Sequence, residues 1–114
     1  MVFALLHGSA RDGMVRQGSD VDIAVYLTRR PTVATYRRIW DAVATVVHGA
    51  ETDVGVLNGA EPVFRFETLK GRLLFTRSRE AYWAFFSLAC REYESQMASY
   101  ERQRRYRIEA RRAA

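Results

Sequence analysis

The sequence has little cysteine and little histidine, and it has no long apolar run. Its single cysteine, Cys90, cannot form an internal disulfide, and one cysteine with two histidines cannot supply a zinc ligand set. The apolar run at the N-terminus, residues 2–6, is too short for a signal-peptide core or a membrane span, and no basic segment precedes it. These absences exclude a disulfide scaffold and a zinc protein. We expect a cytoplasmic protein without an export signal or membrane anchor.

Proline and lysine are also scarce. With only two prolines in 114 residues and no Pro- or Ser-rich stretch, the sequence shows no linker, and its length predicts one domain. Lys70 is the one lysine among 18 cationic residues, and 13 acidic residues leave a net charge of +5. This charge suits a phosphate-bearing or acidic partner, although GC-rich coding alone also produces an excess of arginine. The 48% hydrophobic content is sufficient for a modest core.

Hydrophobic periodicity predicts an α/β protein in which strands and helices alternate. Residues 20–27 alternate polar or small side chains with apolar ones, which is typical of a strand with two unlike faces. Pro31 predicts the start of a helix whose apolar residues recur every three or four positions up to Gly49. The expected strands are 2–6, 20–27, 51–57 and 72–75, and the expected helices are 31–48, 62–71 and 79–114, with residues 1–78 forming the core.

The last helix is predicted to be long and amphipathic. Its apolar residues follow one another at steps of four, three, four, four and three: Tyr82, Phe86, Ala89, Tyr93, Met97 and Tyr100. The aromatic stretch 82–86 is interpreted as core packing. Six arginines follow, interrupted by Glu101 and Glu109: Arg102, Arg104, Arg105, Arg107, Arg111 and Arg112. We interpret them as a solvated helix end that frays over its last ten residues, with RNA or an acidic partner face as the alternative.

Two carboxylates and a glycine-serine pair form the main chemical motif. Asp20 and Asp22 share one face of a strand, about 6 to 7 Å apart, which is close enough to share one or two divalent cations. Such a pair is common by chance and can equally be a solvated surface feature. Gly8 and Ser9 end the first strand, with ten residues between Ser9 and Asp20. A small residue, exposed amides and a hydroxyl there could hold phosphate oxygens, so the two features together predict a phosphate cradle beside a metal-binding strand.

A third carboxylate is expected from the next strand. Asp53 lies 31 residues beyond Asp22, which is enough chain for a strand–helix–strand crossover to return to the same sheet. Glu51 would share the face of Asp53 by alternation, and it is the alternative if the strand register differs. We interpret His7 as a packed residue near the site rather than as a metal ligand.

The order Gly8-Ser9, ten residues, Asp20-Val21-Asp22 resembles the signature of the minimal nucleotidyltransferases, which are small members of the polymerase-β-like superfamily usually encoded beside a HEPN-domain protein. The resemblance extends to about residue 77, and a long last helix is also usual in the family. It implies a nucleotidyltransferase fold with a small mixed sheet flanked by helices. It also implies an antitoxin that transfers AMP from ATP to a hydroxyl, expected to be a tyrosine's, of a HEPN ribonuclease toxin and so silences the toxin.

The resemblance assigns roles to individual residues. Asp20, Asp22 and Asp53 are the expected catalytic residues and the ligands of two Mg²⁺ ions. The expected nucleotide-binding residues are Gly8, Ser9, Arg11 and Ser19. One departure concerns Asp12, which stands where the family usually has arginine, so that the arginine is displaced by one position to Arg11. An acidic side chain near a triphosphate is electrostatically unfavourable.

Two other functions remain open from the sequence. Asp12, and the absence of the helix that often precedes the first strand in the family, favour a non-catalytic antitoxin that blocks its toxin by binding. A small-molecule nucleotidyltransferase is the weaker alternative, because no second domain is present to build an acceptor pocket. An apolar sheet face left without that helix would favour homo- or hetero-oligomers. Neither membrane attachment nor direct binding of nucleic acid is expected.

Overall fold

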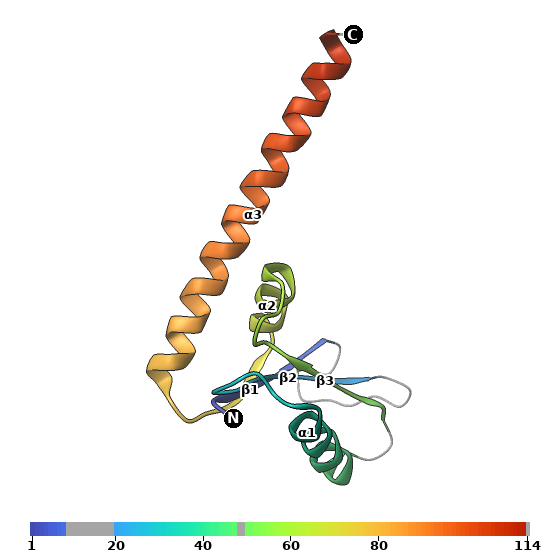
Figure 1. Ribbon diagram of the computed structural model, residues 1–114, viewed down its shortest axis with the longest axis vertical. Coiled ribbons are helices and arrows are strands. Elements are labelled where there is room, and N and C mark those ends of the chain that lie inside the picture. The colour runs from blue at the N-terminus through green and yellow to red at the C-terminus, as the bar shows by residue number, and fades with distance from the viewer. Residues whose placement is uncertain (9–19, 48–49, 114) are drawn as a thin grey trace.

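The computed structural model describes residues 1–8, 20–47 and 50–113, which form seven elements in one α/β arrangement (Figure 1). In chain order they are β1 (Phe3–His7), β2 (Val21–Tyr26), α1 (Val33–Val46), β3 (Thr52–Val56), α2 (Pro62–Leu69), β4 (Arg72–Thr76) and α3 (Arg79–Ala113). The strands form one mixed sheet in the order β3-β2-β1-β4. β1 is antiparallel to β2 and β4, whereas β2 and β3 are parallel. The predicted fold class is therefore confirmed.

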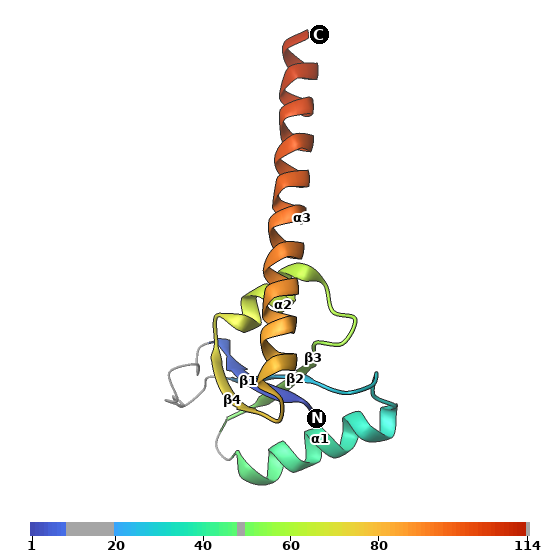
Figure 2. The same cartoon turned by 90° about the vertical axis from the view of Figure 1, so that its left-hand side faces the viewer.

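Helices cover both faces of the sheet. α1 packs on one face, and α2 with the first turns of α3 packs on the other (Figures 1 and 2). Side chains alternate along β1, so that Phe3 and Leu5 face α2 and α3 while Ala4 faces α1. Phe3 is fully buried; its ring stacks on Tyr26 at 5.2 Å between centroids and meets Phe85 edge-on at 5.2 Å. The main core therefore joins β1, β2 and α3.

The loop that follows β3 is tied to the end of β2 by one side chain. The Asn58 amide accepts a hydrogen bond from the Leu27 N–H at 2.9 Å and donates one to the Leu27 carbonyl at 2.7 Å. Gly59 follows with a φ of +72°, a left-handed conformation that glycine adopts without strain. The turn at these two residues is thus bound to the end of the neighbouring strand β2.

The structure differs from the predicted helices in three details. The helix expected from Pro31 begins at Val33, because Thr32 is its N-cap and accepts a hydrogen bond from the Thr35 N–H at 3.2 Å. Val46 continues the apolar spacing of this helix but is 77% exposed, whereas Ile39, Trp40 and Val43 pack against the core. Trp83, in the aromatic stretch expected to be core, is 60% exposed because Tyr82 and Phe85 occupy the buried side of α3.

α3 extends far beyond the sheet. It gives the molecule extents of 60 × 34 × 27 Å, and every residue from Tyr100 to Ala113 is exposed (Figure 2). The sequence predicts fraying over the last ten residues, whereas the structure describes a helix through Ala113. None of the helices in the described part of the chain is both long and apolar enough to cross a membrane.

Candidate active site

Three polar side chains meet at one end of the sheet, next to the segment that joins β1 to β2. The strand register places His7 beside Asp22 across the antiparallel pair, and Asp22 beside Asp53 across the parallel pair. Residues directly opposite each other share a face, and neighbouring strands lie about 4.8 Å apart. The two carboxylates are therefore adjacent on the face that α2 covers. The register thus selects Asp53, rather than Glu51, as the neighbour of Asp22.

Gly8 lies directly against one of these carboxylates, that of Asp22. Its φ is +73°, and a Cβ at this position would collide with Oδ2 of Asp22. A glycine is therefore required at this position for two reasons. Its backbone is in the left-handed region, and the Asp22 carboxylate occupies the space that a side chain would fill. The Gly8 backbone and the Asp22 carboxylate therefore lie in direct contact.

The other predicted site residues divide into two groups. Asp20 is exposed and lies two residues before Asp22, and the Val21 N–H donates to the Glu51 carbonyl at 2.7 Å, so the parallel pairing continues to the start of both strands. The second group lies outside the described residues: Ser9, Arg11, Ser19 and also Asp12, the residue that differs from the usual arginine of the family. Their placement as nucleotide-binding residues stays a prediction.

His7 is half-buried, and its surroundings favour the neutral imidazole. Burial lowers the pKa of His7 below its usual 6.5, against the opposing effect of the Asp22 and Asp53 carboxylates. Its ring meets the Phe64 ring edge-on at 5.9 Å, and the Phe64 ring also covers Gly55, where a Cβ would come within 2.8 Å of it. The environment is that of a packed residue beside the carboxylates, as the sequence predicts.

The sequence does not reveal that Phe64 and Gly71 contribute to the surroundings of His7. Gly71 was expected only to end a helix, yet a Cβ there would collide with the Leu6 carbonyl oxygen and approach the His7 Cα at 3.0 Å. The chain between α2 and β4 therefore packs in close contact with the end of β1. Neither role has a local signal, because each depends on which residue of another element lies opposite.

Comparison with known families shows the class to which this chain belongs. The family model described as "Polymerase beta, Nucleotidyltransferase" matches residues 1–80, which hold the whole sheet. The chain belongs to the polymerase beta nucleotidyltransferase family. This confirms the superfamily resemblance of the Gly8-Ser9 and Asp20-Val21-Asp22 signature. No curated protein matches the sequence of this nucleotidyltransferase significantly.

Solved structures share the fold of this nucleotidyltransferase over 94% of its length. A chain of a toxin–antitoxin complex with AMP-PNP superposes with a TM-score of 0.76 at 18% identity, covering 86% of that chain. A complex of a tri-AMPylated Shewanella oneidensis HEPN toxin with an MNT antitoxin gives a TM-score of 0.70 at 16% identity and 82% coverage of the matched chain. The MntA-HepT toxin–antitoxin complex gives 0.69 at 16% identity and 83% coverage. At these identities the likeness establishes the fold.

The carboxylates suit the magnesium that nucleotidyltransferase chemistry implies. Mg²⁺ prefers oxygen ligands and is usually held by one or two carboxylates together with substrate phosphates, rather than by an all-protein cage. Asp22 and Asp53 are such a pair, with room for the Asp22 carboxylate over Gly8. Within residues 1–8, 20–47 and 50–113, no group of three or more His, Cys, Asp or Glu side chains could hold a metal by itself.

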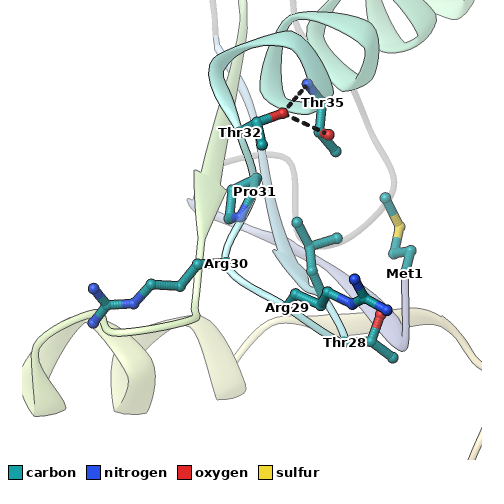
Figure 3. A pocket seen from close by; sticks show the side chains of 8 residues that line it. Met1, Thr28, Arg29, Arg30, Pro31, Thr32 and Thr35 are labelled. Atoms are coloured by element: carbon teal, nitrogen blue, oxygen red, sulfur yellow. Dashed lines mark hydrogen bonds between the residues drawn. The ribbon is translucent and has the colours of Figure 1, made fainter.

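A separate hollow of about 330 Å³ lies at the other end of β2, around the loop that leads into α1 (Figure 3). Figure 3 shows Arg29 extending toward Met1, whereas Arg30 extends away from the Thr32 hydroxyl. The full lining is Met1, Leu27, Thr28, Arg29, Arg30, Pro31, Thr32 and Thr35. Asp22 and Asp53 lie toward the opposite ends of β2 and β3, so this hollow is not part of the candidate active site of the nucleotidyltransferase.

Proposed function

We propose that this protein is an antitoxin that transfers AMP from ATP, with Mg²⁺, to a hydroxyl of a cognate HEPN-family toxin. The observation that carries the proposal is the register that sets Asp22 beside Asp53, with the Asp22 carboxylate resting over the Gly8 turn. Family membership supports a nucleotidyl transfer. The similar fold of an antitoxin bound to a tri-AMPylated HEPN toxin supports AMP as the group and a toxin as the acceptor.

The proposed reaction is an in-line displacement at the α-phosphorus of ATP. The acceptor hydroxyl oxygen forms the new bond to phosphorus, and the bond from phosphorus to the pyrophosphate oxygen breaks, so that pyrophosphate leaves with the electron pair. Bound Mg²⁺ supplies neutralisation of the triphosphate charge and a lowered pKa of the attacking hydroxyl. Asp20 and Asp22 would hold the metal on the nucleotide side. Asp53 lies beside Asp22 and would receive the acceptor hydroxyl and its proton.

The nucleotide would bind along the turn that follows β1. Gly8 would allow the triphosphate to approach the backbone closely, because it has no side chain to hold phosphate oxygens away from the backbone amides. Ser9, Arg11 and Ser19 are the proposed donors to the phosphate oxygens. His7 stays packed against Phe64 and helps to hold the end of β1 in place.

The proposal is tested by transfer of label from α-³²P-ATP to the co-purified HEPN protein. Asp22→Asn and Asp53→Asn should abolish labelling while leaving the complex and the thermal unfolding temperature intact. Glu51→Gln tests the register, since it should leave transfer close to wild type. Asp41→Asn, at an exposed position on α1, controls for the loss of one negative charge. Undiminished labelling by either aspartate variant would refute the mechanism.

A second function remains a candidate because of Asp12. An acidic residue in the loop where the family usually carries arginine would weaken attraction for a triphosphate. A protein that kept the scaffold without using ATP would neutralise its toxin by binding alone. Tight complex formation with no label on the partner, with and without Mg²⁺, would support this function over the transferase.

A further inference from the structure

The face of α3 that packs on the domain continues beyond the domain as a row of arginines. Tyr82, Phe85 and Ala89 are the buried residues of this helix. Steps of three and four from Ala89 keep to the same face and lead through three partly or mostly apolar side chains, Tyr93, Met97 and Tyr100. The next positions in the series are Arg104, Arg107 and Arg111. One face therefore changes from core packing to positive charge where the helix leaves the domain.

This exposed end of α3 carries most of the net charge of the protein. Residues 101–112 contain six arginines and two glutamates, so their charge is 6 − 2 = +4, out of +5 for the whole chain. Glu101 lies 4.0 Å from the Arg104 guanidinium and 3.5 Å from that of Arg105. All of these side chains are exposed, and exposed ion pairs hold their partners weakly. The arginines are thus available to a stronger acidic partner.

A groove of about 630 Å³ lies at the base of this segment, where α3 separates from the start of α2. Its lining is Glu61, Pro62, Glu92, Ser95, Gln96, Ser99 and Tyr100. The Gln96 amide donates to the Tyr100 hydroxyl at 2.7 Å, but its buried oxygen Oε1 accepts no hydrogen bond from the described residues. Because this oxygen has almost no accessible surface, it belongs to the wall of the groove and is not a contact point for a partner.

We propose that the row Arg104, Arg107 and Arg111 docks an acidic protein surface, and that this interface ends at the groove, where Glu61 and Glu92 would repel the carboxylates of the partner. The partner would present carboxylates spaced over about 10 Å, the rise between the first and last arginine. Arginine forks bind carboxylates with two parallel hydrogen bonds, which lysine cannot do. This inference rests on the proposed function, since the docked protein is the one that receives the AMP.

A protein partner fits this surface better than RNA does. Tyrosine, methionine and arginine are enriched at protein–protein interfaces and lysine is depleted there, which matches the row that runs from Tyr93 through Met97 to the arginines.

The test compares two triple charge reversals that change the net charge equally. R104E/R107E/R111E reverses the proposed row, whereas R102E/R105E/R112E reverses arginines that the 100° helical step places on the other side of α3. The probe is the HEPN protein that co-purifies with the full chain, and binding is measured by isothermal titration. We expect the first variant to bind about 100-fold more weakly, the second to stay within about threefold of wild type, and wild-type affinity to fall with added salt.

Three results would overturn the inference: wild-type affinity of the first variant, equal losses in both variants, or loss of binding to a tRNA-sized RNA without loss of binding to the protein. Its failure is distinct from failure of the proposed function. A first variant that binds and labels the partner normally refutes the docking surface and leaves the transferase in place. A wild-type complex that forms through the arginine row but never labels the partner supports docking and refutes the transferase.

Discussion

The contact between Gly8 and Asp22 makes a sharp prediction for the substitution Gly8→Ala. The new methyl group would occupy the position of the Asp22 carboxylate, so this side chain must rotate away from its place beside Asp53. The backbone at residue 8 must also keep a φ of +73°, where alanine is strained. The substitution therefore combines backbone strain with the displacement of a proposed metal ligand.

The two effects can be separated by their magnitudes. An alanine in the left-handed region costs about 1–2 kcal/mol, which lowers the unfolding temperature of a domain of this size by about 4 to 8 °C. Gly59→Ala should show the same loss, because Gly59 has a φ of +72° and its added Cβ would meet only the flexible side chain of the exposed Arg30. Displacing a catalytic group by about 1 Å can cost about 100-fold in rate. Only Gly8→Ala should show that loss of rate.

The assay is single-turnover transfer of labelled AMP to the HEPN partner, paired with thermal unfolding of both variants. The temperature is held about 15 °C below the lower unfolding midpoint, so that partial unfolding does not contribute. Equal transfer by the Gly8→Ala and Gly59→Ala proteins would refute the reasoning, because the space over Gly8 would then have no part in positioning Asp22. Parallel titration of Mg²⁺ should show a weaker apparent affinity for Gly8→Ala alone.

Substitutions at three further positions probe the packing of the fold and of the site. Phe3→Ala removes the buried ring at the centre of the aromatic core and should cost about 3–5 kcal/mol in urea unfolding; a loss under about 1 kcal/mol would contradict its central place. Asn58→Ala leaves the Leu27 amide and carbonyl unpaired and should cost about 1–3 kcal/mol, whereas Asn58→Asp should retain the bond from the Leu27 N–H. For His7, burial lowers the pKa of the imidazole in the folded state below 6.5. As the pH falls below 6.5 in EDTA, the imidazole is therefore protonated in the unfolded chain before it is protonated in the folded protein. The free energy of unfolding decreases as a result. His7→Phe should flatten that slope between about pH 7.5 and 5.5, and an unchanged slope would assign it to other groups.

Much of the fold follows from local patterns in the sequence. Alternation over residues 20–27 predicts β2 because a strand with two unlike faces requires a period of two, and the observed strand is Val21–Tyr26. Helix boundaries were less accurate, since capping by Thr32 rather than by the ring of Pro31 decides where α1 begins. The exposed side of α3 at Trp83 could not be predicted, because aromatic residues crowd several sides of that helix and only packing against the sheet selects among them.

The scarcity of cysteine, histidine and long apolar runs, together with the spaced glycine and aspartate motif, determined the class of this protein from its sequence alone. Chemistry that needs close backbone approach and paired carboxylates restricts residue types at fixed spacing, and such restrictions remain visible in one dimension. Tertiary structure decided which carboxylate lies beside Asp22 and which residues pack against His7. It also decided that the core-facing row of α3 continues as arginines outside the domain. These facts depend on strand register and on where a helix leaves its support, and both are set by contacts between residues far apart in the chain.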